Sequence, residues 1–107
     1  TIAFIGAGNM GRAIIGGLLQ GGHPAAGLRA ADADPGTRER AAREFGIMTS
    51  EDNLAVATGA DVLVLAVKPQ QLAPVATALR PVTLARHPLV LSIAAGIGTA
   101  AMTRWLG

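Results

Sequence analysis

The N-terminal sequence Ile2-Ala3-Phe4-Ile5-Gly6-Ala7-Gly8-Asn9-Met10-Gly11-Arg12 carries the strongest structural signal in the chain. Its first residues are apolar, which is typical of a parallel strand buried on both faces. Three glycines follow with the spacing G-x-G-x-x-G, and the apolar residues then recur at helical spacing. Gly6 permits a tight turn, Gly8 lets a pyrophosphate approach the backbone, and Gly11 lets the helix pack closely against the strand. We therefore expect a strand, a phosphate-binding turn, and a helix whose free N–H groups face the phosphates.

Asp32 supports this interpretation because it follows Gly11 by 21 residues. In dinucleotide sites of this kind, an acid about 20 residues beyond the glycines binds a ribose hydroxyl. A carboxylate there repels a 2′-phosphate and so favours NAD. Arg38, in the helix that follows, is interpreted as a solvated helix charge, with binding of that phosphate as the alternative. With 14 glycines in 107 residues, the alternative is a glycine-rich turn that binds nothing.

Strand and helix patterns alternate along the whole chain, and no hairpin signal appears. The apolar patterns predict strands at 2–5, 28–31, 47–48, 62–67 and 89–94, with helices at 10–20, 35–45, 51–58, 72–79 and 99–106 and a loop over 80–88. Met10, Ile14 and Leu18 should form the apolar face of the first helix, and Thr49 or Ser50 should cap the helix at 51–58. Such alternation predicts an α/β fold with a parallel sheet in the order 3-2-1-4-5 and helices on both faces. The order reverses between the first and fourth strands, and the crevice above that point is where we expect a ligand.

Composition limits the class of protein. The 107 residues fit one domain, and the formal net charge is only +2 with 3% aromatic residues, which argues against a nucleic-acid surface. The sequence contains no run of about 18 apolar residues, so it predicts no membrane span. Its N-terminus lacks the basic segment of a signal peptide, so we expect none. The chain has no cysteine, which excludes disulfides and Cys-based metal sites and suits the cytoplasm.

Three predicted strand ends should converge at the crevice, at residues 6–11, 66–69 and 94–97, and small residues dominate all three. Lys68, the only lysine, lies where the fourth strand ends; it either marks that end or lies against the nicotinamide half of a cofactor. Arg12 is interpreted as an exposed arginine, with a pyrophosphate contact as the alternative. His23 and His87 fall in predicted loops and are interpreted as solvated or structural histidines, and Trp105 is expected to cover the edge of the core. No pattern predicts catalytic residues or a metal site, so a cofactor would bring the reactive hydride.

Four segments together resemble pyrroline-5-carboxylate reductase. They are residues 2–11, residues 61–67 followed by Lys68-Pro69-Gln70, residues 91–97, and Trp105-Leu106-Gly107. The resemblance covers essentially the whole chain. It implies a Rossmann-type domain of an oxidoreductase that reduces 1-pyrroline-5-carboxylate to L-proline with NADP(H) or NAD(H), the last step of proline biosynthesis.

The resemblance also implies a set of cofactor-binding residues. The pyrophosphate would lie on Ile5, Gly6, Ala7, Gly8, Asn9 and Met10, and the adenosine ribose beside Asp32 and Asn53. The nicotinamide side would be lined by Ala66, Val67, Lys68, Pro69, Ala94, Ala95 and Gly96. Catalytic and metal-binding residues are expected to be absent from the chain.

The family continues into a sixth strand and a helical domain that forms the oligomer and the substrate pocket. We therefore expect residues 1–107 to be one dinucleotide-binding domain of a longer, cytoplasmic, homo-oligomeric enzyme, inactive by itself, with a small-molecule substrate and no nucleic-acid or membrane partner. The alternatives are the cofactor domain of another oxidoreductase, such as a 3-hydroxyacid dehydrogenase or another imine reductase, and a nucleotide sensor without enzymatic activity.

Overall fold

The computed structural model describes residues 1–86 and 88–92, whose strands form a parallel five-stranded sheet in the order β3-β2-β1-β4-β5. This is the predicted order. The strands are β1 (Ile2–Ile5), β2 (Leu28–Ala31), β3 (Met48–Ser50), β4 (Val62–Leu65) and β5 (Leu89–Ser92). β1 is central, because Ile2 to Ile5 pair with Leu28 to Ala31 on one side and with Val62 to Leu65 on the other.

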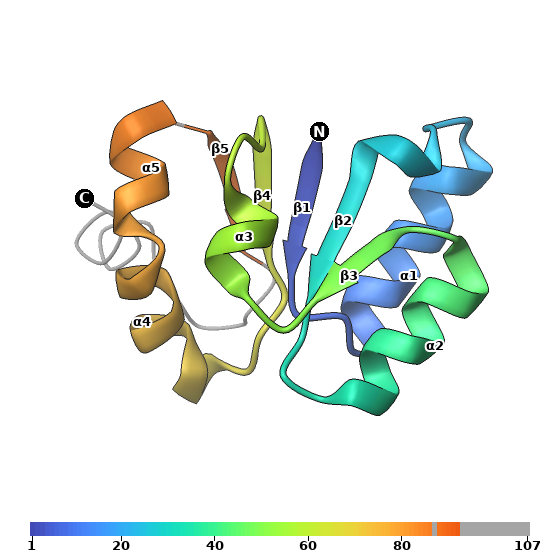
Figure 1. Ribbon diagram of the computed structural model, residues 1–107, viewed down its shortest axis with the longest axis horizontal. Coiled ribbons are helices and arrows are strands. Elements are labelled where there is room, and N and C mark those ends of the chain that lie inside the picture. The colour runs from blue at the N-terminus through green and yellow to red at the C-terminus, as the bar shows by residue number, and fades with distance from the viewer. Residues whose placement is uncertain (87, 93–107) are drawn as a thin grey trace.

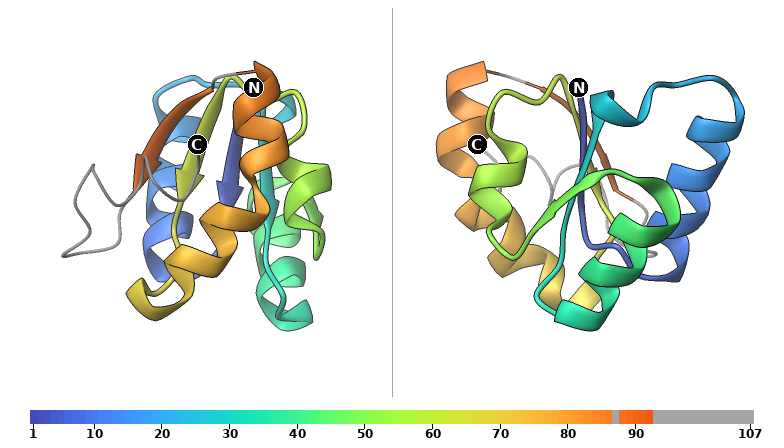
Figure 2. Two further views of the ribbon diagram at one scale, coloured as in Figure 1. Left: turned by 90° about the vertical axis from the view of Figure 1, so that its left-hand side faces the viewer. Right: turned by 45° about the vertical axis from the view of Figure 1, so that its right-hand side comes forward.

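Helices cover both faces of this sheet (Figure 1). α1 and α2 lie on one face, and α3, α4 and α5 lie on the other; the right-hand view of Figure 2 shows the strands running between these two groups. The bounds are α1 (Asn9–Gln20), the short 3₁₀ turn η1 (Ala25–Gly27), α2 (Pro35–Phe45), α3 (Asn53–Ala57), α4 (Pro69–Ala78) and α5 (Arg80–Arg86).

The core divides into two clusters because successive side chains of a strand point to opposite faces. Phe4 belongs to the cluster beneath α1 and α2, which also contains Ile15 and Val64. Its neighbour Ile5 belongs to the cluster beneath α3 and α4, together with Leu72. The chain begins with an apolar run because β1 is buried on both faces of the sheet.

Several element boundaries differ from the sequence prediction: α3 spans Asn53–Ala57 rather than residues 51–58, β4 ends at Leu65 rather than at residue 67, and α4 begins at Pro69 rather than at residue 72. The cap of α3 is Asp52, which accepts hydrogen bonds from the N–H groups of Leu54 (3.0 Å) and Ala55 (3.3 Å). Thr49 or Ser50 was the expected cap, but both extend β3, where Ser50 pairs with Ala31. The hydroxyl oxygen of Ser50 instead accepts a hydrogen bond from the N–H of Asp52 at 3.1 Å, just before the helix begins.

The predicted loop over residues 80–88 is wrong for most of its length, because Arg80–Arg86 forms α5. Pro81 does not prevent this helix, because proline is tolerated in the first turn of a helix. Thr83 is buried, and its N–H donates to the carbonyl of Leu79 at 3.1 Å, so the chain passes from α4 into α5 with little interruption.

Met10 was expected on the apolar face of the first helix, but its side chain is 60% exposed. The buried residues of α1 are Gly11 and Ile15. The predicted end of the fifth strand at residues 93–94, the last helix, Trp105 and His87 lie outside the described residues.

Candidate functional site

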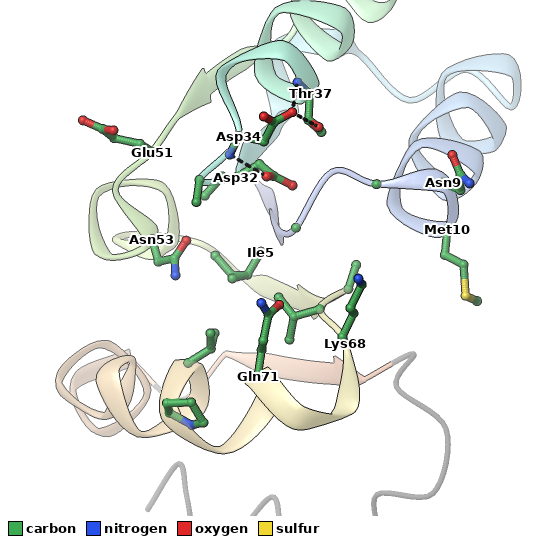
Figure 3. A pocket seen from close by; sticks show the side chains of 18 residues that line it. Ile5, Asn9, Met10, Asp32, Asp34, Thr37, Glu51, Asn53, Lys68 and Gln71 are labelled. Carbon is green, nitrogen blue, oxygen red and sulfur yellow. Dashed lines mark hydrogen bonds between the residues drawn. The ribbon is translucent and has the colours of Figure 1, made fainter.

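A cleft with a volume of about 960 Å³ lies at the carboxyl ends of β1, β2 and β4 (Figure 3). Its walls come from the turn after β1, the loop after β2, the starts of α3 and α4, and the loop after β4. This is the position predicted from the reversal of strand order.

Gly6 and Gly11 make the turn after β1 geometrically possible. Gly6 has φ +100°, and a Cβ atom there would lie 2.5 Å from the carbonyl oxygen of Ala66. A Cβ atom on Gly11 would lie 2.7 Å from the carbonyl oxygen of Gly6. Both contacts are shorter than van der Waals packing allows, so these positions need glycine for the close approach of turn, helix and β4.

Gly8 differs from both, because a Cβ atom there would meet nothing within 4 Å. Gly8 is the N-cap residue of α1 and lines the cleft. No side chain caps this end of α1, and its first turn contains no acidic residue. Neither a capping side chain nor an acidic residue of the first turn therefore pairs with the N–H groups at the start of α1, and their arrangement suits a phosphate ligand.

Asp32 ties the glycine turn to the loop after β2. One carboxylate oxygen, Oδ2, accepts a hydrogen bond from the N–H of Ala7 at 2.9 Å, and Oδ1 accepts one from the N–H of Asp34 at 3.0 Å. The carboxylate thus holds two loops that border the cleft in a fixed relation. An ionised carboxylate can accept further hydrogen bonds, so Asp32 can still contact a ribose hydroxyl.

Asp34 caps α2 from the same loop. Its Oδ2 atom accepts hydrogen bonds from the N–H of Thr37 at 2.8 Å and from the hydroxyl of Thr37 at 2.7 Å. The hydroxyl bond, followed by the backbone bond, lowers the pKa of Asp34 below its ordinary value of 3.8. The carboxylate is therefore ionised at neutral pH.

Arg38 lies one turn further along α2, and backbone carbonyls hold its guanidinium. Its Nη1 atom donates to the carbonyl oxygen of Asp32 at 2.9 Å and to that of Ala33 at 3.2 Å, and lies 3.9 Å from Oε2 of Glu51. Arg38 is not among the residues that line the cleft. The sequence suggested a solvated charge, whereas the structure places Arg38 behind the loop that it stabilises.

The opposite wall is formed by the starts of α3 and α4. Asn53 is the first residue of α3, and Lys68 is the exposed N-cap residue of α4. In Figure 3 the side chains of Asn53, Lys68 and Gln71 project into the space between α4 and the glycine turn.

Most residues predicted from the sequence as cofactor contacts line this one cleft. They are Ile5, Gly6, Gly8, Asn9, Met10, Asp32, Asn53, Ala66, Val67 and Lys68. Ala7 contributes its N–H to Asp32, and Pro69 is the first residue of α4. Ala94, Ala95 and Gly96 lie outside the described residues.

Sequence reasoning missed several residues that also line the cleft: Ala31, Ala33, Asp34, Thr37, Glu51, Gln71, Pro74 and Val75. Gln71 could have been found from helical spacing, because it lies three residues after Lys68. Glu51 directly follows β3, the neighbour of β2, so it reaches the same edge of the sheet.

Two further candidates do not contribute to the cleft. Arg12 is not simply exposed: its Nη2 atom lies 2.8 Å from Oε2 of Glu44 on α2, so the two side chains form an ion pair that joins α1 and α2. The ring Nδ1 of His23 lies 3.1 Å from the carbonyl oxygen of Pro24, in a loop that does not border the cleft.

Within the described ranges, no helix combines the length and the apolar character that crossing a membrane requires. In the same part of the chain, His, Asp and Glu side chains nowhere gather in a group that could hold a metal ion.

Comparison with known proteins yields one family model, described as NADP oxidoreductase, coenzyme F420-dependent, which matches residues 1–96. A pyrroline-5-carboxylate reductase of Pseudomonas aeruginosa is 51% identical over 108 aligned positions, which include 99% of this chain and 38% of that protein. The chain thus spans a little over a third of the length of the curated relatives it matches.

Solved structures give the same picture. A pyrroline-5-carboxylate reductase from Coxiella burnetii superposes with a TM-score of 0.96 at 36% identity, covering 99% of this chain and 39% of the other. A Plasmodium falciparum pyrroline carboxylate reductase with NADP bound has a TM-score of 0.84 over 100% of this chain and 38% of its own. At 21% identity, that second likeness shows the fold alone.

Proposed function

The chain belongs to the family described as NADP oxidoreductase, coenzyme F420-dependent, and we propose that it is the cofactor-binding part of a pyrroline-5-carboxylate reductase. The observation that carries this proposal is the cleft at the glycine turn, where α1 begins without a capping side chain. The relative that is 51% identical across almost all of the chain supports the choice of substrate.

The glycine turn would hold the pyrophosphate of the dinucleotide. Ile5 to Met10 form this turn, and the open space beside Gly8 gives a phosphate access to the N–H groups at the start of α1. The positive end of the helix dipole adds a favourable charge interaction there.

The two halves of the dinucleotide would lie on either side of this turn. Asp32 and Asn53 would contact the adenosine ribose, since a carboxylate can accept a hydrogen bond from a ribose hydroxyl. Ala66, Val67, Lys68 and Pro69, together with Ala94, Ala95 and Gly96, would border the nicotinamide. The small side chains in this set suit a flat ring lying against the ends of the strands.

The dinucleotide, when bound, would supply a hydride to the imine carbon of 1-pyrroline-5-carboxylate, and a proton taken up by the ring nitrogen completes the conversion to L-proline. We assign no catalytic residue to this chain. The role proposed for residues 1–107 is that of one domain that binds and orients the cofactor, while the substrate pocket belongs to the remainder of the complete enzyme. We also propose that the complete enzyme is a cytoplasmic homo-oligomer formed through a helical domain.

A chimeric enzyme tests the proposal. Residues 1–107 are joined to the remainder of the Pseudomonas aeruginosa reductase, in place of the segment that aligns with them. We expect the chimera to oxidise NADH or NADPH only when 1-pyrroline-5-carboxylate is present, and to form proline. A folded chimera that binds the dinucleotide but forms no proline would contradict the proposed substrate.

A Gly8→Val chimera is the matched control, because it should keep the fold and bind the cofactor much more weakly. The 107-residue chain assayed alone should bind the dinucleotide without turnover. Turnover comparable to that of the chimera would show that the chain already contains a substrate pocket, contrary to the proposed division of roles.

A further inference from the structure

The charged side chains that line the cleft are distributed unevenly. Asp32, Asp34 and Glu51 bring three carboxylates to the end formed by the loops after β2 and β3. The only cation among the described residues that line the cleft is Lys68, which lies at the start of α4. Among the described residues, the side chains that line the end of the cleft beside β2 are therefore acidic, and the cation beside them, Arg38, is not part of the lining.

The start of α2, which could otherwise bind a phosphate, is already occupied by a carboxylate. Oδ2 of Asp34 accepts both the N–H and the hydroxyl hydrogen of Thr37. Pro35, the first residue of the helix, has no N–H to donate. A ligand phosphate would have to displace the carboxylate of Asp34 to reach these donors.

Arg38 is the nearest cation, and its position is unfavourable for a ligand phosphate. Its Nη1 atom is engaged with the carbonyl oxygens of Asp32 and Ala33, and the carboxylate of Glu51 lies 3.9 Å away. A phosphate that contacts Nη1 of Arg38 would therefore have to compete with two carbonyl oxygens and with the carboxylate of Glu51, a residue that lines the cleft.

NADP differs from NAD only by a phosphate on the 2′-oxygen of the adenosine ribose, and the acid after the second strand marks where that ribose lies. From the distribution of charge and donors, we infer that this cleft selects NAD(H) over NADP(H). The inference rests on the proposed function and disagrees with the NADP of the family's description. A 2′-hydroxyl can donate to the carboxylate of Asp32, whereas a 2′-phosphate brings a charge of about −1.5 to −2 to three carboxylates.

Binding of two ligand pairs tests the inference on the 107-residue chain by isothermal titration calorimetry. The pairs are NADH with NADPH, and ADP-ribose with 2′-phospho-ADP-ribose; the second pair isolates the adenosine half, which lies against described residues. We expect the ligand without the 2′-phosphate to bind at least about tenfold more tightly in both pairs, a ratio that corresponds to about 1.4 kcal/mol. The ratio should narrow as the salt concentration rises, because salt screens the repulsion.

Equal affinities, or tighter binding of NADPH, would overturn the inference and leave the proposed function standing. If none of the four ligands bound to the folded chain, the proposed function would fall as well. The two failures are therefore distinguishable.

Two variants assign the selectivity to its residues. Glu51→Gln removes one exposed carboxylate from the cleft and should narrow the NADH-to-NADPH affinity ratio about two- to fivefold, the range expected for an exposed charge. Asp32→Asn should narrow it further. The control is Glu39→Gln, which makes the same change of charge on α2 away from the cleft and should leave the ratio unchanged. A ratio unaffected by both Glu51→Gln and Asp32→Asn would refute the role of these carboxylates.

Discussion

Substitutions at the three glycines of the turn should separate folding from cofactor binding. Gly6→Ala forces a Cβ atom to within 2.5 Å of the carbonyl oxygen of Ala66 at a residue with φ +100°. The positive φ costs about 1–2 kcal/mol for a non-glycine residue, and relieving such a contact costs about 1–3 kcal/mol. The sum of about 2–5 kcal/mol is a large share of the roughly 5–15 kcal/mol that stabilises a domain of this size.

Gly8→Val should have the opposite pattern of effects. Gly8 has φ −72° and ψ −164°, which valine adopts without strain, and nothing lies within 4 Å of the new Cβ atom. We expect the free energy of unfolding to change by no more than about 1 kcal/mol. The branched side chain would instead fill the space proposed for the pyrophosphate. Losing one hydrogen bond to a charged phosphate, worth about 1.5–3 kcal/mol, weakens binding about 10- to 150-fold.

Gly11→Ala should fall between these two variants. Its Cβ atom would lie 2.7 Å from the carbonyl oxygen of Gly6, but Gly11 lies within α1, where alanine is favoured. Thermal unfolding followed by circular dichroism should therefore give the highest melting temperature for Gly8→Val, an intermediate one for Gly11→Ala and the lowest for Gly6→Ala. The melting temperature of Gly6→Ala should lie roughly 10–30 °C below that of the unmodified chain.

Calorimetric titration with NADH then supplies the second measurement on each variant that folds. The reasoning is refuted if Gly8→Val binds NADH as tightly as the unmodified chain. The reasoning is equally refuted if the melting temperature of Gly8→Val falls as far as that of Gly6→Ala. The open space beside Gly8 would then not accommodate the valine side chain as the account requires.

Three further variants test other contacts in the structure. Asp34→Ala should lower the melting temperature at pH 7. Because folding lowers the pKa of Asp34, its carboxylate stabilises the fold above the unfolded pKa near 3.8, and this stabilisation is lost as the pH falls through the folded pKa. The melting temperatures of the variant and the unmodified chain, measured between about pH 2 and pH 7, should therefore converge at the acidic end, and a difference that stays constant with pH would contradict this. A double-mutant cycle of Arg12→Ala and Glu44→Ala should give a coupling energy of about 0.2–1 kcal/mol that decreases in high salt, whereas zero coupling at low salt would show that the ion pair does not stabilise the packing of α1 on α2. Asp32→Asn leaves one acceptor oxygen for two N–H donors, those of Ala7 and Asp34, so it should loosen the glycine turn at Ala7. We expect calorimetry to show NADH binding weakened about 2- to 10-fold. An unchanged affinity for NADH would show that the link between the two loops is not needed for binding.

The sequence was sufficient for the architecture because local patterns decide it. Alternating strand and helix patterns allow few arrangements once crossovers are right-handed, and the observed strand order is the predicted one. The bounds of β2 and α2 also agree with the prediction, since Asp34-Pro35 and Gly46 are strong start and stop signals and Gly46 has φ +67°.

The remaining features depend on tertiary contacts that local patterns do not record. Arg38 was expected to be solvated, but the loop after β2 curves over it and presents two carbonyl oxygens. The orientation of Met10 toward the cleft depends on where the turn places the start of α1. Glu51 joins Asp32 at the cleft because β3 pairs with β2, a long-range contact.

The central claim is that a dinucleotide lies with its pyrophosphate on the glycine turn, and a titration of the ¹⁵N-labelled chain with NADH, followed through the backbone amide signals, tests it most directly. The account predicts that the largest shifts are those of residues 6–10, followed by Asp32, Asn53 and residues 66–68, while the outer face of α2 around Glu39 and Arg43 stays unchanged. Saturable binding that shifts the α2 signals and leaves residues 6–10 unperturbed would contradict it.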